Sequence, residues 1–355
     1  MSVYAFATHL IFVCLVAFVS WYVTKKVLAM NILDIPNKRS SHEKPTPRGG
    51  GLGIVISFFI GVLAIYLLAD QTQVHEKYFW SFLISTVLIA VISMYDDIKG
   101  YSFKVKLITQ LIAVCLVMLT GTVLDQIALP WLGELHLGIW GVLLTVFWLV
   151  GLTNAYNFMD GVDGMAVSTA LIVGVFFAWV TFFEGSHFIY LVSLVIVAGS
   201  LGFLPWNFPK ARIFMGDIGS TFFGFTFACM AIIAARYDMS HTSFLVLPLL
   251  LFHYIFDTSF TLFRRKMAGE NIVEAHKTHI YQLIHQLGWS HVQVTGLYAF
   301  LAVVQGFAAI YMVSVEGGQR WCVLLPFMVV YLLAALFVVR KARKRGVLPL
   351  PCEYS

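Results

Sequence analysis

Long apolar runs separated by short polar segments dominate this sequence. Eleven of these runs approach the roughly 20 residues that a helix needs to cross a lipid bilayer. They cover residues 4–24, 50–68, 79–95, 107–124, 137–153, 165–183, 187–204, 219–235, 243–263, 293–313 and 321–339. The pattern predicts an all-α integral membrane protein, a polytopic bundle of about 11 transmembrane helices.

The composition supports this prediction. Hydrophobic residues make up 60% of the 355 residues and charged residues only 12%, whereas soluble domains have about 25% charged residues. A water-soluble globule of this size is excluded, because apolar side chains must also cover its outside. The runs are continuous rather than alternating, which excludes a β-barrel.

The basic residues predict the orientation of the bundle. Of 23 Lys and Arg residues, 20 lie in segments on one side of the predicted membrane, and only Lys77, Arg236 and Arg320 lie on the other. By the positive-inside rule the basic side is cytoplasmic, so the N-terminus faces outward and the C-terminus is cytoplasmic. The sequence has no fixed-period repeat or linker, which favours a single domain over residues 1–355.

The basic tail from Arg340 to Arg345 is the candidate for binding nucleic acid or anionic lipid. A run of this kind after an apolar segment is typical of a lipid-headgroup anchor. We therefore expect membrane lipid, and no nucleic acid, as its partner.

Five aspartates gather on the predicted cytoplasmic side. They are Asp96, Asp97, Asp160, Asp163 and Asp217, and each lies at a membrane boundary beside Gly or another Asp. Close carboxylates repel one another unless they share a cation or a proton. Such hard oxygen ligands suit Mg²⁺, with Mn²⁺ as a second option. The alternative is five solvated aspartates at helix ends.

Two of these aspartates belong to a polar row. Amide or carboxyl residues recur every third position from Asn154 to Asp163, through Asn157 and Asp160. On a straight α-helix such a row would spread around half the cylinder. We therefore expect the chain to unwind at the glycines that follow Asp160 and Asp163, which would turn the row toward one site.

Asp217 lies in a second motif, FMGDIGS at 214–220. Gly216 and Gly219 flank it at a predicted helix N-terminus, where backbone N–H groups attract phosphate and an acid can hold a metal. We predict that Asp217 binds Mg²⁺.

Basic residues on the same side are candidates for phosphate binding. Lys44 and Arg48 belong to the segment EKPTPRGGG at 43–51, whose glycines allow backbone to approach a pyrophosphate. The alternative is a lipid-anchoring loop with a close glycine helix contact. Arg264 and Arg265 are the other basic candidates, and they precede the segment from His276 to Gln282 in the last large loop on this side.

Two histidines and one deep acid complete the set of candidates. His276 and His279 lie three residues apart and could bind metal or phosphate, or form ordinary polar surface. Asp257 lies inside a predicted span, where an acid is functional by default. Capping of a neighbouring helix and pairing with Arg264 are its alternatives.

Four motifs together resemble the polyprenyl-phosphate N-acetylhexosamine-1-phosphate transferase family. They are the aspartate pair at 96–97, NxxNxxDGxDG at 154–164, FMGDxGS at 214–220 and PTPRGGG at 45–51. The eleven spans and outer N-terminus resemble the bacterial branch that starts O-antigen, enterobacterial common antigen or teichoic acid linkage synthesis. This resemblance implies a bacterial inner membrane, with the N-terminus periplasmic and the active site on the cytoplasmic face.

The resemblance implies a reaction and roles for the motif residues. A UDP-linked N-acetylhexosamine would donate its sugar 1-phosphate to undecaprenyl phosphate, with Mg²⁺, releasing UMP. Asp217 would be a metal ligand, and Asp160 a second one. Asp96 and Asp97 would lie at the reacting phosphates as catalytic residues, whether as base, nucleophile or aid to the metal. Asn157, Asp163, Lys44, Arg48, Arg264, Arg265 and His279 would bind substrate.

The sequence departs from the family pattern at one motif. Where the eleven-span branch often has an HIHH-like sequence, this chain reads His279-Ile280-Tyr281-Gln282. The change points to a different sugar, such as a 6-deoxy-N-acetylhexosamine. A secondary transporter and a non-catalytic scaffold remain as alternative functions, and a homodimer as an open oligomeric state.

Overall fold

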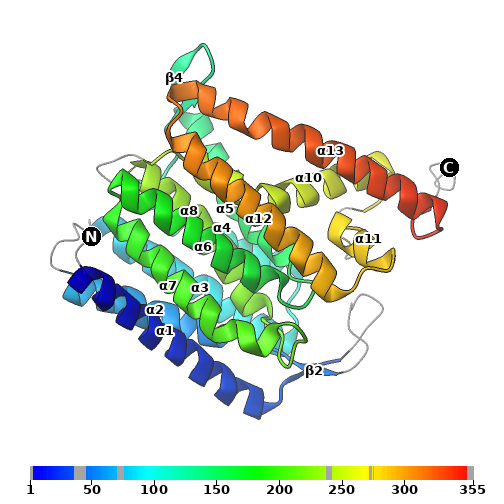
Figure 1. The fold of residues 1–355 in the computed structure, drawn as a ribbon, viewed down its shortest axis with the longest axis horizontal. Coiled ribbons are helices and arrows are strands. Elements are labelled where there is room, and N and C mark those ends of the chain that lie inside the picture. Colours follow the sequence, from blue (N-terminus) through cyan, green and yellow to red (C-terminus); the bar gives the residue numbers. More distant parts are fainter. Residues whose placement is uncertain are drawn as a thin grey trace.

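The computed structural model describes residues 3–35, 45–69, 76–236, 242–271, 274 and 276–349. The chain is almost entirely helical (Figure 1). The helices are α1 (Val3–Met30), α2 (Gly51–Leu68), α3 (Glu76–Lys99), α4 (Phe103–Leu119), α5 (Ile139–Phe158), α6 (Met165–Glu184), α7 (His187–Asn207), α8 (Asp217–Arg236), α9 (Val246–Leu250), α10 (Phe252–Met267), α11 (Ile280–Gln286), α12 (His291–Val313), the 3₁₀ turn η1 (Gly317–Gln319) and α13 (Arg320–Lys344). Two short antiparallel pairs join them, β1 (Leu33–Asp34) with β2 (Thr46–Pro47) and β3 (Gln126–Leu129) with β4 (Gly133–His136).

The polytopic membrane bundle predicted from the apolar runs is confirmed. Within the described residues, 9 helices are long and apolar enough to cross a bilayer. Of the two remaining predicted spans, one is α4, which forms a single helix of 17 residues.

The prediction of one unbroken helix over 243–263 is wrong. The segment forms α9 and α10, which are separated at Leu251 (φ −104°, ψ 15°). Pro248 lies inside α9 and has no N–H to donate, which weakens the ladder next to the break. Asp257 therefore lies on α10, a helix separate from α9.

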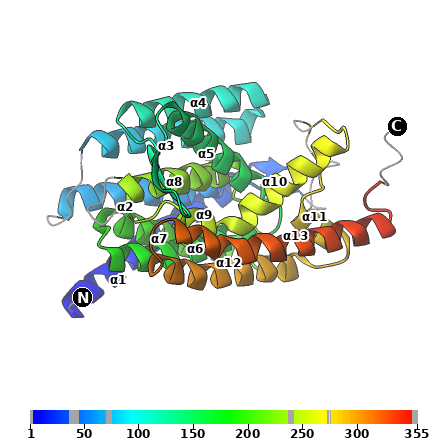
Figure 2. The same cartoon turned by 90° about the horizontal axis from the view of Figure 1, so that it is seen from above.

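Helix α8 lies at the centre of the bundle (Figure 2). Every residue from Ile218 to Ala234 is buried, and α8 packs against α5, α3 and α2. Its Gly, Ala, Ser and Thr residues let neighbouring backbones approach closely, which is how helices associate when water is absent. Helix α8, which begins with Asp217, is therefore surrounded by other parts of the bundle along nearly its whole length.

Glycine contacts fix the start of α8 against the start of α2. A Cβ atom at Gly51 would lie 2.5 Å from the Cα of Gly219 and 2.8 Å from the carbonyl oxygen of Met215. The backbone N–H groups of Gly50 and Gly51 donate to the carbonyls of Phe214 and Met215, both at 2.9 Å. The glycine run at 49–53 thus pairs two motifs that are far apart in sequence.

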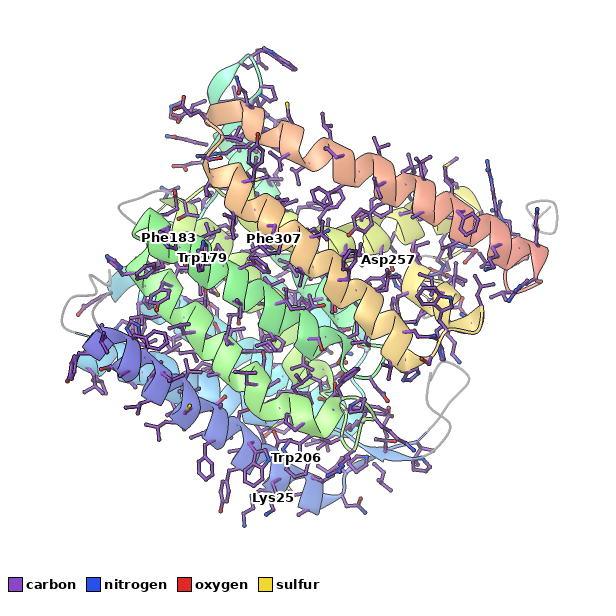
Figure 3. The ribbon with its side chains drawn as sticks, viewed as in Figure 1. Lys25, Trp179, Phe183, Trp206, Asp257 and Phe307 are labelled. Carbon is purple, nitrogen blue, oxygen red and sulfur yellow. The ribbon has the colours of Figure 1, made fainter. Side chains whose placement is uncertain are left out.

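The two ends of the bundle differ. The helix ends and loops that carry the aspartate motifs lie at the end where α1 finishes and α2 begins, and α13 also finishes there (Figure 1). Aromatic residues mark both ends: Trp179 and Phe183 lie near one, and Trp206 near the other with Lys25 (Figure 3). Such belts are typical of the two membrane interfaces.

The close approach of Gly51 and Gly219 gives a stability prediction. G51A should lower the thermal unfolding midpoint of the detergent-solubilised protein, by the equivalent of about 1–3 kcal/mol, because backbone atoms cannot move aside for a methyl group. G151A, in α5, has no atom within 4 Å of the added Cβ and should leave the midpoint unchanged or raise it slightly. Equal midpoints for the two variants would contradict this packing.

Candidate functional site

The polar row from Asn154 to Asp163 lies at one end of the bundle, with Asn154 and Asn157 at the end of α5 and Asp160 and Asp163 in an unwound turn. Helix α5 ends at Phe158 and α6 begins at Met165, so the expected unwinding at the glycines is confirmed. Gly164 has a φ of +77°, a conformation that favours glycine. Gly161 is equally restricted, because a Cβ there would lie 2.1 Å from the hydroxyl oxygen of Tyr281.

Asp217 is the first residue of α8, as the FMGDIGS motif predicts. Its carboxylate accepts hydrogen bonds from Asn157 Nδ2 at 3.0 Å and from Lys106 Nζ at 2.6 Å. Asn157 Nδ2 also donates to Ser220 Oγ at 2.9 Å. The Asn157 and Asp217 motifs therefore meet directly in the structure.

Lys106, from α4, is a site residue that the sequence analysis missed. Its ammonium group lies between the carboxylates of Asp96 and Asp217 and pairs with both. Gln110 lies one turn further along α4 and shares a hydrogen bond of 2.8 Å with Asn154. Residues four positions apart lie on one face of a helix, so the only available signal was this polar pair near the end of an apolar run.

The adjacent residues Asp96 and Asp97 have different partners. Asp96 pairs with Lys106 and accepts the Tyr101 N–H at 2.6 Å. Both oxygens of Asp97 face the start of α8, where they accept the N–H groups of Asp217 at 3.0 Å and Ile218 at 3.1 Å. Asp97, which is only 6% exposed, therefore satisfies two of the N–H groups that every helix start leaves unpaired.

Asp160 has the least compensated charge in the cluster. Its carboxylate accepts no hydrogen bond within the described part of the chain. Burial, followed by the charges of Asp217, Asp97 and Asp163, raises the pKa of Asp160 to about 8. Burial and the neighbouring carboxylates thus keep Asp160 protonated near neutral pH, and a bound cation can replace this proton.

These acids fit a divalent cation that also binds substrate. Among the described residues, no three His, Cys, Asp or Glu side chains are grouped closely enough to enclose a metal by themselves. Mg²⁺ does not need such a cage, because it commonly takes one or two carboxylates and completes its shell with water and substrate phosphates. The unpaired Asp160, and a Lys106 ammonium held between two carboxylates, show that the cluster attracts positive charge.

Asp163 lies beside the cluster and is held by a different set of groups. Its Oδ2 accepts the Ala211 N–H at 3.2 Å, and its Oδ1 lies 3.3 Å from His291 Nδ1. Thr295 Oγ1 donates to the Asp163 carbonyl at 2.8 Å. The start of α12 therefore supports this end of the polar row.

Of the predicted basic residues, Arg48 lies close to the cluster. Its positive charge acts on the Asp97 carboxylate, and its Nη1 lies 3.9 Å from Asp34. Lys44 falls outside the described residues. Arg48 thus lies near the acids, as a phosphate-binding residue would.

Arg265 has a different environment from the one predicted for it. Its guanidinium is 5% exposed and donates to Glu270 at 2.7 Å and to the carbonyls of Asn271 and Glu274. With its donors used inside the loop, Arg265 orders the segment after α10. Arg264 donates Nη2 to the carbonyl of Thr278 at 2.7 Å.

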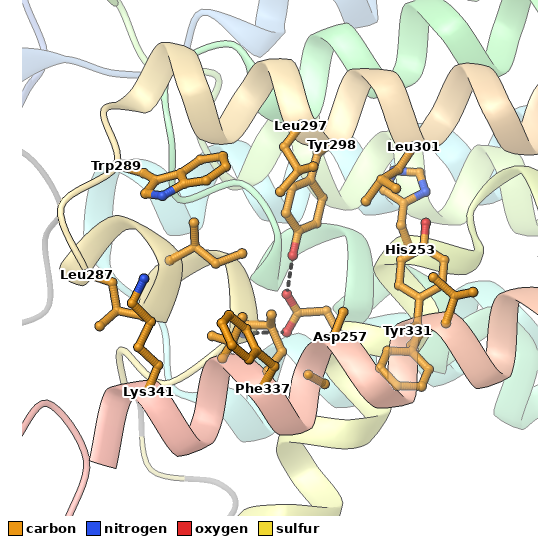
Figure 4. A pocket seen from close by; sticks show the side chains of 17 residues that line it. His253, Asp257, Leu287, Trp289, Leu297, Tyr298, Leu301, Tyr331, Phe337 and Lys341 are labelled. Carbon is orange, nitrogen blue, oxygen red and sulfur yellow. Dashed lines mark hydrogen bonds between the residues drawn. The ribbon is translucent and has the colours of Figure 1, made fainter. Parts of the chain in front are cut away.

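Asp257 caps a neighbouring helix, one of the alternatives raised by its sequence position. Its oxygens accept the N–H groups of Ile280 at 2.8 Å and Tyr281 at 3.0 Å, at the start of α11. His279 Nδ1 lies 3.3 Å away, and Tyr298 donates its hydroxyl at 2.7 Å (Figure 4). His279 is thus buried against Asp257 in this structure.

Helix α11 connects Asp257 to the acid cluster. Tyr281 donates its hydroxyl to the carbonyl of Phe158 at 2.9 Å, two residues before Asp160, and its ring fills the space left by Gly161. The tyrosine that replaces the first later histidine of the HIHH-like sequence therefore shapes the turn that carries Asp160. Burial raises the pKa of Tyr281 well above its ordinary value, so it stays a hydrogen-bond donor at neutral pH.

Comparisons with known proteins agree with this geometry. The family model described as "Glycosyl transferase family 4" matches residues 79–235. The chain is 34% identical over 272 residues to the "Probable undecaprenyl-phosphate N-acetylglucosaminyl 1-phosphate transferase" of Bacillus subtilis, with 76% of this chain and 74% of the relative covered. It is 30% identical over 303 residues to the "Decaprenyl-phosphate N-acetylglucosaminephosphotransferase" of Mycobacterium tuberculosis H37Rv, covering 77% and 74%. It is 26% identical over 358 residues to the "Undecaprenyl-phosphate alpha-N-acetylglucosaminyl 1-phosphate transferase" of Yersinia pestis, covering 97% and 94%.

The contacts of Asp97 give a prediction about α8. D97A should increase hydrogen–deuterium exchange at the amides of Asp217 and Ile218 and lower stability by about 1–2 kcal/mol, because two helix-start N–H groups lose their acceptor. S102A is the matched control, since Ser102 starts α4 without a side-chain cap bond. Unchanged exchange at 217–218 in D97A would show that Asp97 does not hold α8.

The raised pKa of Asp160 predicts proton release on metal binding. At pH 7 the carboxyl is mainly protonated in the metal-free protein, so binding of Mg²⁺ should release about one proton, and clearly less at pH 9. Calorimetric titration in two buffers of different ionisation enthalpy measures the number released. D160N should abolish the difference between the buffers, and a difference that survives in D160N would assign the proton to another group.

Proposed function

Because this chain belongs to glycosyl transferase family 4, among the polyprenyl-phosphate N-acetylhexosamine-1-phosphate transferases, we propose that it transfers N-acetylglucosamine 1-phosphate from UDP-N-acetylglucosamine to undecaprenyl phosphate. UMP is the second product. The observation that carries the proposal is the meeting of Asn157, Asp217 and Lys106 at the start of α8, with Asp96, Asp97 and Asp160 beside them. The names of the relatives support the choice of sugar and lipid.

The chemistry requires two anions to approach each other. An oxygen of the lipid phosphate attacks the phosphorus that carries the sugar, the bond to the bridging oxygen breaks, and that oxygen leaves with UMP. A new P–O–P linkage joins lipid and sugar. The main barrier is the charge that gathers at a low-dielectric membrane boundary, so positive groups must be placed there beforehand.

The charged residues of the site fit this requirement. Asp217 and Asp160 would hold Mg²⁺ or Mn²⁺ with Asn157 beside them, and the bound cation would offset the charge on the transferred phosphate. Lys106 and Arg48 supply fixed positive charge on either side of the acids. Lys44 and Arg264 are proposed to bind substrate from the flanking segments, and Asp163 to orient it.

Asp97 is proposed as a positioning residue rather than a nucleophile. Both of its oxygens accept backbone N–H groups of α8, so attack on phosphorus would first require it to release that helix. Asp96, held by Lys106 and Tyr101, is the carboxylate left to act near the lipid phosphate. Direct attack by the already ionised lipid phosphate needs no acid–base step at either residue.

Donor choice is proposed to depend on the segment from Arg264 to Trp289. It contains Tyr281, which contacts the turn beside Asp160, together with Arg265, which orders the loop, and His279, which lies against Asp257. A 6-deoxy donor is the second candidate sugar. The product would start O-antigen, other lipopolysaccharide or related cell-surface polysaccharide, with the site at the cytoplasmic face.

A transporter would need acids deep in the membrane along a path between its two faces. Here the acids gather at one end of the bundle, where α3 and α5 finish and α8 begins. That distribution favours chemistry at a single membrane surface.

The proposal is tested by measuring UMP and lipid-linked sugar. Purified protein with undecaprenyl phosphate, Mg²⁺ and UDP-N-acetylglucosamine should form both products. K106M should reduce the turnover at least about 100-fold, because it removes a fixed charge that stabilises the transition state. K104M, an exposed lysine two residues away on α4, is the control and should retain turnover. The proposed reaction would be refuted if folded protein formed no product with UDP-N-acetylglucosamine, UDP-N-acetylgalactosamine or their 6-deoxy analogues.

A further inference from the structure

A second cluster of positive charge lies outside the acid site, where α10 and α13 finish. A cavity of about 310 Å³ there is lined by Arg264 of α10 and Arg343 of α13, with Phe260, Phe263, Met267 and Leu348 among its apolar walls. None of the five aspartates of the candidate site lines it. The cavity therefore shares only Arg264 with the residues proposed to bind substrate and contains none of the acids.

The two arginines line the same cavity, and each has one donor atom without an acceptor among the described residues. The Nε atoms of both are shielded from solvent and have no hydrogen-bond partner within the described ranges. The charge of Glu270 stabilises the positive form of Arg264, and the charge of Arg343 opposes it. Glu270 also lines the cavity, but Arg265 Nε binds its carboxylate at 2.7 Å. Shielded Nε donors without an acceptor, on two like charges that line one cavity, are costly unless an anion binds them.

The walls of the cavity indicate what kind of anion. Phe263 is 65% exposed and Met267 72% exposed beside Arg264 on α10, so an apolar surface leads directly to the two guanidinium groups. Planar guanidinium groups bind phosphate oxygens in pairs, whereas exposed Phe and Met in a membrane protein contact lipid chains. Neither inorganic phosphate nor a neutral lipid would use both features.

We propose that the cavity between the ends of α10 and α13 binds the phosphate of a membrane lipid, with the lipid chain along Phe263 and Met267. The phosphate joins Arg264 to Arg343 and so ties the last helix to α10. Arg264 also holds the carbonyl of Thr278, next to His279, which lies against Asp257. The site is thus placed to couple the lipid around the protein to α11 and the turn that carries Asp160.

Binding is measured on the full-length protein in neutral detergent, without UDP-sugar, by native mass spectrometry. The probes are phosphatidic acid, phosphatidylglycerol, undecaprenyl phosphate, diacylglycerol and inorganic phosphate. Phosphate-bearing lipids should bind the native protein, and R343Q should weaken them at least about tenfold, because the guanidinium pairs with phosphate oxygens. R340Q removes the same charge from an exposed position on α13 and should stay within about twofold of the native protein, since exposed pairs contribute little.

Two further results make the test decisive. Without lipid, R343Q should unfold no earlier than the native protein, since it removes an unpaired, repelled charge, whereas a purely structural Arg343 would lower the midpoint. R343K should retain part of the binding.

Preference for undecaprenyl phosphate would identify the lipid as the acceptor substrate, and equal binding of all phosphate lipids would identify it as bulk membrane lipid. Diacylglycerol or inorganic phosphate binding as tightly as phosphatidic acid, or equal losses in R343Q and R340Q, would overturn the proposal.

Discussion

A buried carboxylate that accepts the N–H groups of a helix start is the interaction on which this site depends. Asp97 does this for α8 and Asp257 for α11, each with both oxygens. Inside a membrane an unpaired N–H group costs several kcal/mol, and the positive end of a helix favours a negative partner. The same bonds therefore stabilise the fold and decide where Asp217 and Tyr281 lie.

The carboxylates of the site are only partly neutralised by neighbouring basic groups. Asp96 and Asp217 share Lys106, whereas Asp160 has no partner among the described residues and has a pKa of about 8. A cluster in which the described carboxylates outnumber the basic groups beside them is more stable when Asp160 keeps its proton. A divalent cation would replace that proton, which links the charge of the cluster to the chemistry proposed for it.

The second cap extends the site away from the acids. Asp257 forms part of the wall of an apolar cavity of about 280 Å³ between α10, α12 and α13, where Tyr298 holds it from α12 (Figure 4). Tyr281 continues this chain of contacts to the carbonyl of Phe158. The last helices, which carry none of the aspartates, thus support the turn at Asp160 through α11.

The sequence alone determined the features that depend on local pattern. Apolar runs fixed most of the spans, and paired glycines fixed the unwound turn after α5 and the start of α8 at Asp217, because these follow from hydrophobic length and from backbone freedom. Only the tertiary structure decided which groups meet. Lys106 pairs with Asp217 across 111 residues, and Asp97 reaches α8 across 120. Arg265 orders its own loop, and a break at Leu251 frees α10. Such pairings depend on helix packing, which residue type and local spacing do not specify, so they became visible only in the folded bundle.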